Sequence, residues 1–215
     1  WGRDRSDGKE MISAFLHGYL LSFGLILPLG PQNTFVFTQG ATQQKLIRSL
    51  PVAVAASLAD TFLILLAVFG VSVIVLTIPI IKTILTLVGI GFLLYIGWVT
   101  WKSEPTTNEK PNEFDSLKKR IVFALSVSLL NPHAILDTMG VIGTSAITYN
   151  GDERFAFTFA CILNSWLWFF GLTIMGRALG VVDRNGSALK VLNKVSAVII
   201  WISSLYLAVG LVGGV

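Results

Sequence analysis

The chain has 215 residues, of which 53% are hydrophobic and only 13% are charged, and its mean hydropathy is +0.73. Soluble domains carry about 25% charged residues and need a polar surface at this size, so the composition excludes an ordinary soluble domain and favours one membrane-embedded domain. The net charge of +4 does not indicate nucleic-acid binding, because Lys and Arg lie in short loops between apolar segments, where they set membrane orientation.

A mostly polar segment, 1–10, precedes the first methionine, Met11, and carries six charges. We interpret it as a tag or upstream sequence and expect one transmembrane domain over 11–215. No separate signal peptide is expected, because the first apolar stretch is too long and lacks an obvious small-residue cleavage site.

Six apolar stretches match the length of about 20 residues that a helix needs to cross a membrane. We therefore predict an all-α polytopic membrane protein with about six transmembrane helices. The connection 102–118 contains two prolines among Lys, Glu and Asn, which indicates an exposed loop. The predicted spans are 14–38, 49–71, 79–101, 119–146, 155–177 and 191–213.

Lys and Arg are distributed unevenly among the predicted connections. Most of them lie between spans 1 and 2, spans 3 and 4, and spans 5 and 6, whereas the other side has Lys82, Arg154 and the leading segment. Because positively charged loops stay in the cytoplasm, these three connections, including 102–118, are predicted to be cytoplasmic and both termini to lie outside.

The first span is interrupted by Pro28, Gly30 and Pro31 within one helical turn. Proline removes a backbone donor and clashes with the preceding turn, which frees backbone groups. Inside a membrane such groups need partners or a water-filled cavity. Gln32 and Asn33 follow directly and can either satisfy these groups or bind a ligand. A simple kink is the alternative interpretation.

A second interruption lies in span 4, where Asn131-Pro132 follows Gly30-Pro31 at an offset of 101 positions, and Asn164 follows Asp60 at an offset of 104. Three spans per half would give the halves opposite orientations, as in the inverted repeats of secondary transporters, whose helices break at matching positions. A chance match of two prolines is the alternative. The predicted halves are about 11–101 and 119–213.

Two carboxylates, Asp60 and Asp137, lie inside the predicted spans. A carboxylate near the middle of a membrane costs about 2.5–3.5 kcal/mol, so we expect a role in binding or proton exchange. His133 and Asp137 are four residues apart on one helical face and could relay protons. The alternative is a structural hydrogen bond that closes the kink. His17, near the start of span 1, is expected to be interfacial.

Several motifs follow one another over essentially the whole chain from about residue 12: Leu29-Gly30-Pro31-Gln32-Asn33 leading to Gln39-Gly40, Ser57-Leu58-Ala59-Asp60, Leu130-Asn131-Pro132-His133-Ala134-Ile135-Leu136-Asp137, and Trp168-Phe169-Phe170-Gly171. Their order and spacing resemble the lysine exporter family, including its arginine-exporting members. The resemblance implies a small multi-pass exporter of L-lysine or L-arginine in the bacterial cytoplasmic membrane, driven by ion gradients.

The resemblance also implies which residues form the functional core. The chain departs from the basic amino-acid exporters at Ile135, where they usually have tyrosine, and at Asn164, and both positions could alter the cavity. Candidates for proton coupling are Asp60, His133 and Asp137. Candidates for substrate binding are Gly30, Pro31, Gln32, Asn33, Asp60, Asn131, Pro132 and Asp137.

We expect Asp60 and Asp137 to face one central cavity and to receive the cationic side chain of the substrate. The amides and helix ends near Pro31 and Pro132 would hold its α-carboxylate and α-ammonium groups. Outward movement of one positive charge costs about 2.3 kcal/mol per 100 mV, so we expect a coupling ion, most simply a proton. No cofactor is expected.

Other functions stay as alternatives. Export of a neutral amino acid or another small cation is one; a channel is less favoured, because Asn131-Pro132-His133-Ala134 is only loosely similar to the paired Asn-Pro-Ala motifs of aquaporins. An enzyme is not expected, since no zinc-protease, serine-hydrolase or nucleotide-binding motif occurs in the sequence.

The single cysteine, Cys161, provides no disulfide and no Cys-based metal cluster. A homodimer is possible, although nothing in the sequence locates an interface.

Overall fold

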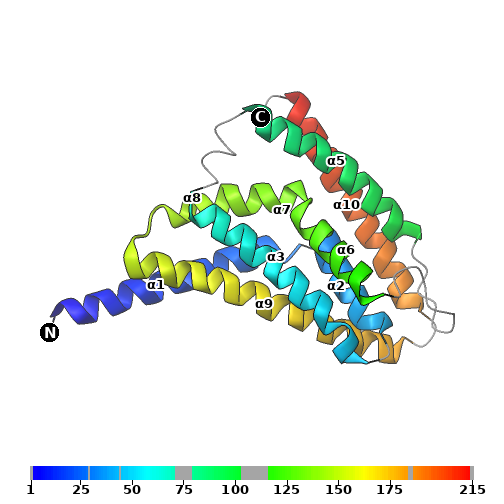
Figure 1. The fold of residues 1–215 in the computed structure, drawn as a ribbon, viewed down its shortest axis with the longest axis horizontal. Helices are drawn as coiled ribbons and strands as arrows, with labels where there is room; N and C mark the ends of the chain where they lie inside the picture. The colour runs from blue at the N-terminus through cyan, green and yellow to red at the C-terminus, as the bar shows by residue number, and fades with distance from the viewer. Residues whose placement is uncertain are drawn as a thin grey trace.

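The computed structural model describes residues 2–28, 30–43, 45–70, 79–102, 116–183 and 186–213, and all regular secondary structure in these ranges is helical (Figure 1). A short 3-10 turn, η1 (Leu46–Arg48), precedes α3, and a π-helical segment, η2 (Thr138–Ile142), joins α7 to α8. The α-helices are α1 (Gly2–Ile26), α2 (Pro31–Thr42), α3 (Leu50–Val68), α5 (Pro79–Lys102), α6 (Leu117–Leu129), α7 (Pro132–Asp137), α8 (Gly143–Ala146), α9 (Gly151–Val182) and α10 (Ser187–Gly213).

Three helices, α3, α9 and α10, are long and apolar enough to cross a membrane singly. Two bent pairs also qualify when each is taken as one span: α1 with α2, bent by 80°, and α6 with the helix that follows it, bent by 55°. The predicted third span, 79–101, coincides with α5, whose 24 residues exceed the length of about 20 that a membrane-spanning helix needs. The structure therefore confirms an all-helical polytopic fold and both predicted breaks. The described residues provide up to five spans by length and composition, and the exact six-span repeat stays a prediction.

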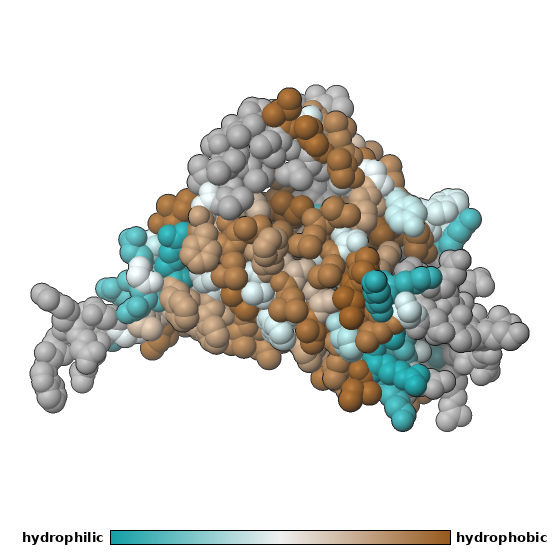
Figure 2. Space-filling view, viewed as in Figure 1, coloured by the Kyte–Doolittle hydropathy of each residue, from teal (hydrophilic) through white to brown (hydrophobic). Residues whose placement is uncertain are grey.

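The end of α2 and the start of α3, the end of α5 and the start of α6, and the end of α9 and the start of α10 lie at the same end of the molecule (Figure 1). Hydrophilic surface gathers at this end and also at the opposite end, near the start of α9, and a hydrophobic band covers the middle of the molecule (Figure 2). The basic residues at this end agree with the uneven charge distribution of the sequence, and the cytoplasmic location of this end stays a prediction. Exposed basic residues here are Lys45, Arg48, Lys102, Lys118 and Lys119.

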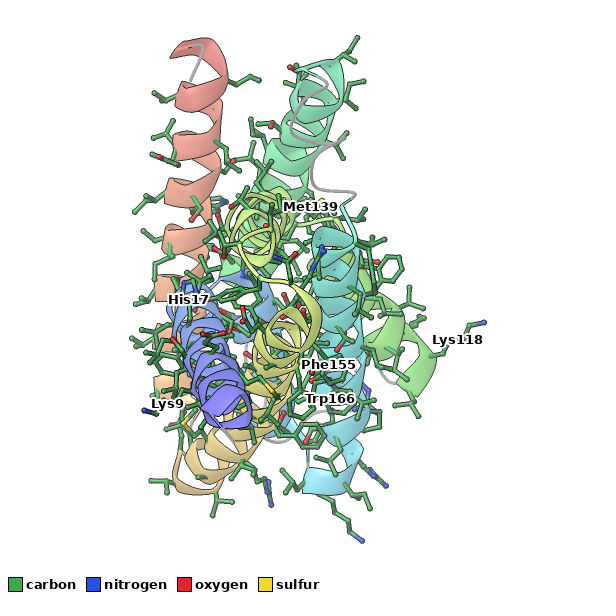
Figure 3. The ribbon with its side chains drawn as sticks, turned by 90° about the vertical axis from the view of Figure 1, so that its left-hand side faces the viewer. Lys9, His17, Lys118, Met139, Phe155 and Trp166 are labelled. Atoms are coloured by element: carbon green, nitrogen blue, oxygen red, sulfur yellow. The ribbon has the colours of Figure 1, made fainter. Side chains whose placement is uncertain are left out.

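Helix α9 is the centre of the packing, because it lies against α1, α2 and α3. Trp166 on α9 donates a hydrogen bond from Nε1 to Thr61 Oγ1 on α3 at 3.1 Å, which joins the two helices through their side chains (Figure 3). The helices α5 and α10 lie side by side and pack mainly on each other. Fewer contacts connect this pair to α2 and α7.

Helices α2 and α9 approach so closely that only glycine fits at their crossing. A Cβ atom on Gly40 would meet the backbone oxygen of Thr173, and one on Gly176 would meet the backbone oxygen of Phe37. Small residues of this kind allow membrane helices to pack through dispersion contacts of their backbones. The crossing therefore holds α2 firmly against the central helix.

We predict that Gly176→Ala destabilises the protein by about 1–3 kcal/mol, because the new methyl group would push the two helices apart. The matched control is Gly171→Ala on the same helix, where a Cβ atom meets nothing within 4 Å. Alanine is the better helix former by about 1 kcal/mol, so the control is expected to be neutral or stabilising. Thermal unfolding in detergent compares the two variants, and equal midpoints would contradict the close crossing.

Candidate functional site

The break between α1 and α2 begins a new helix at Pro31. Gly30 is the N-cap and has an extended conformation, with φ −76° and ψ 179°. Proline suits the first position of a helix, because its fixed φ is helical and its missing N–H has no helical partner to lose. The N–H groups of Gln32 and Asn33 have no acceptor within the helix, whereas Thr34 N donates to Gly30 O at 3.0 Å.

The side chain of Asn33 satisfies the backbone carbonyls that the break leaves open. Its Nδ2 donates to the oxygens of Ile26 and Pro28, at 2.6 and 2.8 Å. Its Oδ1 accepts a hydrogen bond from Trp168 Nε1 on α9 at 3.2 Å. Because both ends of the amide are engaged, Asn33 holds the break in place and ties it to the central helix.

Asp60 on α3 accepts hydrogen bonds from two other helices. Its Oδ1 accepts from Gln32 Nε2 at 2.8 Å, and its Oδ2 accepts from Ser165 Oγ at 3.0 Å. Within the described part of the chain, no Lys, Arg or His forms an ion pair with this carboxylate. Asp60 therefore lies between α2 and α9 with two neutral hydrogen-bond donors and no basic partner among the described residues.

The second break separates α6 from α7 at Leu130 and Asn131. Asn131 is buried, and its carbonyl oxygen accepts from Ile135 N at 3.0 Å. Asp137 ends α7, and the π-helical segment η2 begins at the next residue. Single π-helical turns inside α-helices are frequent at functional sites.

A cavity of about 140 Å³ lies where the two breaks, α3, α5, α9 and α10 meet, and we call it the central cavity. A water molecule needs about 10–15 Å³ by the same measure, so the cavity has room for several waters or a small ligand. The described polar and break residues that line it are Ser22, Pro28, Gly30, Pro31, Gln32, Asn33, Asp60, Asn131, Asp137, Thr138, Asn164, Ser165 and Ser203.

The structure thus brings together seven of the eight candidate substrate-binding residues around the central cavity. Both carboxylates line this one cavity, as expected. The side chains of Pro132 and His133 lie outside the described residues, so the relay through His133 stays a prediction. The seven residues are Gly30, Pro31, Gln32, Asn33, Asp60, Asn131 and Asp137.

Of the two departures from the family pattern, only one reaches the cavity. Asn164 lines it and donates from Nδ2 to Ser22 Oγ at 3.1 Å. Ile135 does not line it but packs in an apolar cluster with Leu63 and Met139, and Ala134 lines the cavity instead. Ile135 thus has no direct place in the lining, because the helix turns this side chain toward α3, and its effect on the cavity stays a prediction.

Hydroxyl groups are the part of the site that the sequence did not reveal. Ser165 donates to Asp60, and Ser22 accepts from Asn164. Single serines are common in apolar helices, so neither position stands out by its spacing. The one available signal was that Ser165 follows Asn164, the residue at the repeat position of Asp60.

His17 takes part in an aromatic cluster away from the central cavity. Its Nδ1 lies 2.8 Å from the hydroxyl of Tyr149, and its ring packs against Phe157 with centroids 5.6 Å apart. The side chain is exposed, as expected for a residue near a membrane surface.

The broken helices and the carboxylates of the central cavity agree with the comparisons to known proteins. The sequence profile described as "LysE: LysE type translocator" matches residues 23–211. The chain belongs to the LysE family. This LysE protein is 50% identical over 200 residues to the candidate amino-acid transporter YisU of Bacillus subtilis (strain 168), with 93% of this chain and 91% of YisU covered.

Two further relatives are named arginine exporter protein ArgO. The one from Salmonella typhimurium (strain LT2) is 33% identical over 202 residues, with 92% of this chain and 94% of the relative covered. The one from Serratia proteamaculans (strain 568) is also 33% identical over 202 residues, with 92% of this chain and 97% of the relative covered. No solved structure matches. The LysE chain is therefore a multi-pass transporter of the bacterial cytoplasmic membrane and not an enzyme.

We predict that Asn33→Leu destabilises this LysE protein by more than about 1–3 kcal/mol, because two carbonyls and the Trp168 indole would lose their partner inside the membrane. Asn150→Ala is the control, since Asn150 is exposed and its side chain caps no helix. Thermal unfolding in detergent measures both. An unchanged midpoint for Asn33→Leu would mean that the break has other partners.

Proposed function

We propose that this LysE-type amino-acid exporter carries basic L-amino acids, arginine and/or lysine, out across the cytoplasmic membrane in exchange for protons. The observation that carries the proposal is that Asp60 and Asp137, from different helices, line one cavity between the two breaks. The names of the arginine-exporting relatives support the same substrate class.

A basic amino acid has three charged groups, and the central cavity offers partners of matching sign. The carboxylates attract the cationic side chain and the α-ammonium group. The free N–H groups at the start of α2, together with the positive end of its dipole, favour the α-carboxylate. Asn131 and Asn164 add neutral hydrogen-bonding groups around the same space.

Asp60 can bind a cation without losing its present partners. A carboxylate has about four lone-pair sites, and Asp60 accepts one hydrogen bond at each oxygen. The remaining sites suit the N–H groups of a guanidinium or ammonium ion. Gln32 and Ser165 thus orient the carboxylate while leaving its charge for the substrate.

The two donors also differ in what they allow when Asp60 takes up a proton. The amide Nε2 of Gln32 can only donate, so a proton on Oδ1 would leave two donors facing each other. The hydroxyl of Ser165 can donate or accept, so a proton on Oδ2 is accommodated when this hydroxyl rotates. We therefore place the exchanged proton on Oδ2, the oxygen beside Ser165.

The first test is counterflow of labelled arginine, lysine or leucine in proteoliposomes, with and without a pH gradient. We predict that Asp60→Asn and Asp137→Asn each lower arginine and lysine exchange at least tenfold, since a charged hydrogen bond of about 1.5–3 kcal/mol is lost. The control, Asp152→Asn, changes an exposed carboxylate in the first turn of α9 and is expected to exchange normally. Exchange of leucine in place of arginine and lysine would contradict the proposed substrate.

Ser165→Ala tests the proton separately from the substrate. We predict that arginine counterflow without a gradient is retained, whereas its acceleration by a pH gradient is weakened, because a proton on Oδ2 loses its acceptor. Ser126→Ala is the comparison, since that hydroxyl donates to Val122 O within α6 and does not line the central cavity. Equal acceleration in both variants would argue against proton binding at this oxygen.

A further inference from the structure

A second cavity, of about 110 Å³, lies on the other side of Pro31, and we call it the inner cavity. Pro31 lines both cavities, so the first turn of α2 separates them. The inner cavity is enclosed by α2, α5, α6 and α10. Its lining is Pro31, Thr34, Phe35, Thr38, Gln39, Ile96, Val99, Thr100, Phe123 and Asn193.

The α2 side of the inner cavity is one continuous helical face. Pro31, Thr34, Phe35 and Thr38 follow each other at spacings of three and four, which places them in a row along the helix. The row runs from the break toward the end of α2, where the connection with Lys45 lies. The inner cavity therefore extends from the central cavity toward the basic end of the molecule.

Two polar atoms on this helix are buried without a partner. Among the described residues, Thr34 Oγ1 and Gln39 Oε1 have no hydrogen-bond partner, and the two residues are only 4% and 8% exposed. By contrast, Thr38 Oγ1 donates to Asn193 Oδ1 at 3.3 Å. Buried polar atoms almost always have partners, so two open ones in the lining of one cavity indicate that a ligand or water fills their capacity.

The unfilled acceptor positions of Thr34 Oγ1 and Gln39 Oε1 suit a ligand that donates hydrogen bonds. The amide oxygen of Gln39 can only accept, and the hydroxyl of Thr34 can accept as well. The rings of Phe35 and Phe123, with centroids 4.5 Å apart, add aromatic surface that attracts a cation. The described lining contains no charged residue, so it would hold a cation more weakly than the carboxylates of the central cavity do.

We propose that the inner cavity is a cytoplasm-side binding subsite that receives the guanidinium or ammonium group of the substrate before it reaches Asp60. Gln39 and Thr34 accept its N–H groups, and the turn at Pro31 separates the two positions. A neutral site suits this step, because a cation held weakly is released readily to the carboxylates. The subsite rests on the proposed function for its substrate class and on the predicted orientation for its side of the membrane.

The test measures arginine affinity at each face of the membrane separately. Inside-out vesicles expose the cytoplasmic face to the medium, and right-side-out vesicles expose the other face. We expect Gln39→Leu and Thr34→Val to raise the half-saturating arginine concentration at the cytoplasmic face about tenfold, since hydrogen bonds to a cation are lost. The half-saturating arginine concentration at the external face is expected to stay within about twofold of the wild-type value.

The control is Thr42→Val on the same helix, where the hydroxyl is exposed and donates to Thr38 O at 2.8 Å. It is expected to leave both affinities unchanged. Thermal unfolding supplies an independent readout: because Thr34→Val and Gln39→Leu remove buried atoms that have no partner, neither is expected to lower the midpoint.

Unchanged affinity at the cytoplasmic face would mean that only water occupies the inner cavity and would overturn the subsite, while wild-type arginine exchange would still support the proposed function. Equal losses at both faces, a loss confined to the external face, or a lowered unfolding midpoint would also overturn it. A wild-type protein that exchanges neither arginine nor lysine would overturn the proposed function and the subsite with it.

Discussion

The structure depends on one constraint: a helix that breaks inside a membrane must find partners for the backbone groups that the break exposes. Lipid offers none, so the protein supplies them from its own side chains. Asn33 does this by donating to the carbonyls of Ile26 and Pro28. Because the partner is a side chain of the next helix, the chain can turn by 80° and still leave these carbonyls satisfied.

Helix α9 connects the break to the other parts of the site. Trp168 donates to Asn33, Ser165 donates to Asp60 and Asn164 donates to Ser22, so the break, the carboxylate and α1 are all held by one helix. The same helix crosses α2 at glycine positions, and Arg177 Nη1 donates to the carbonyl of Gln43, just beyond the end of α2, at 3.1 Å. The geometry of the central cavity therefore follows from the packing of α9.

The two cavities along α2 differ in charge in a way that fits transport. The central cavity has two carboxylates and the start of a helix, which can bind a zwitterion with an additional positive charge. In the inner cavity the described lining is neutral and includes two acceptors without partners. A carrier needs sites that bind strongly enough to select a substrate and weakly enough to pass it on, and the pair of sites that we propose would meet both needs.

Much of this architecture could be predicted from the sequence, because it depends on local chemistry. Hydropathy placed the helices to within a few residues for α3 and α5, and the prolines at 31 and 132 located both breaks. Asp60 and Asp137 could be identified because carboxylates are rare in apolar spans, where each one is costly. The direction of single side chains was less predictable, as Ile135 and Ala134 demonstrate, because the bend after Asn131 shifts the helical face.

The sequence by itself therefore determined the membrane environment, the positions of the breaks and the identity of the two carboxylates that line the central cavity, because each depends on residues that are neighbours in the chain. Only the tertiary structure decided that Gln32 and Ser165 orient Asp60, and that Trp168 completes the hydrogen bonds of Asn33. These partners lie 28, 105 and 135 positions apart. Separations of this kind are bridged by the crossing of whole helices, which short sequence patterns do not encode.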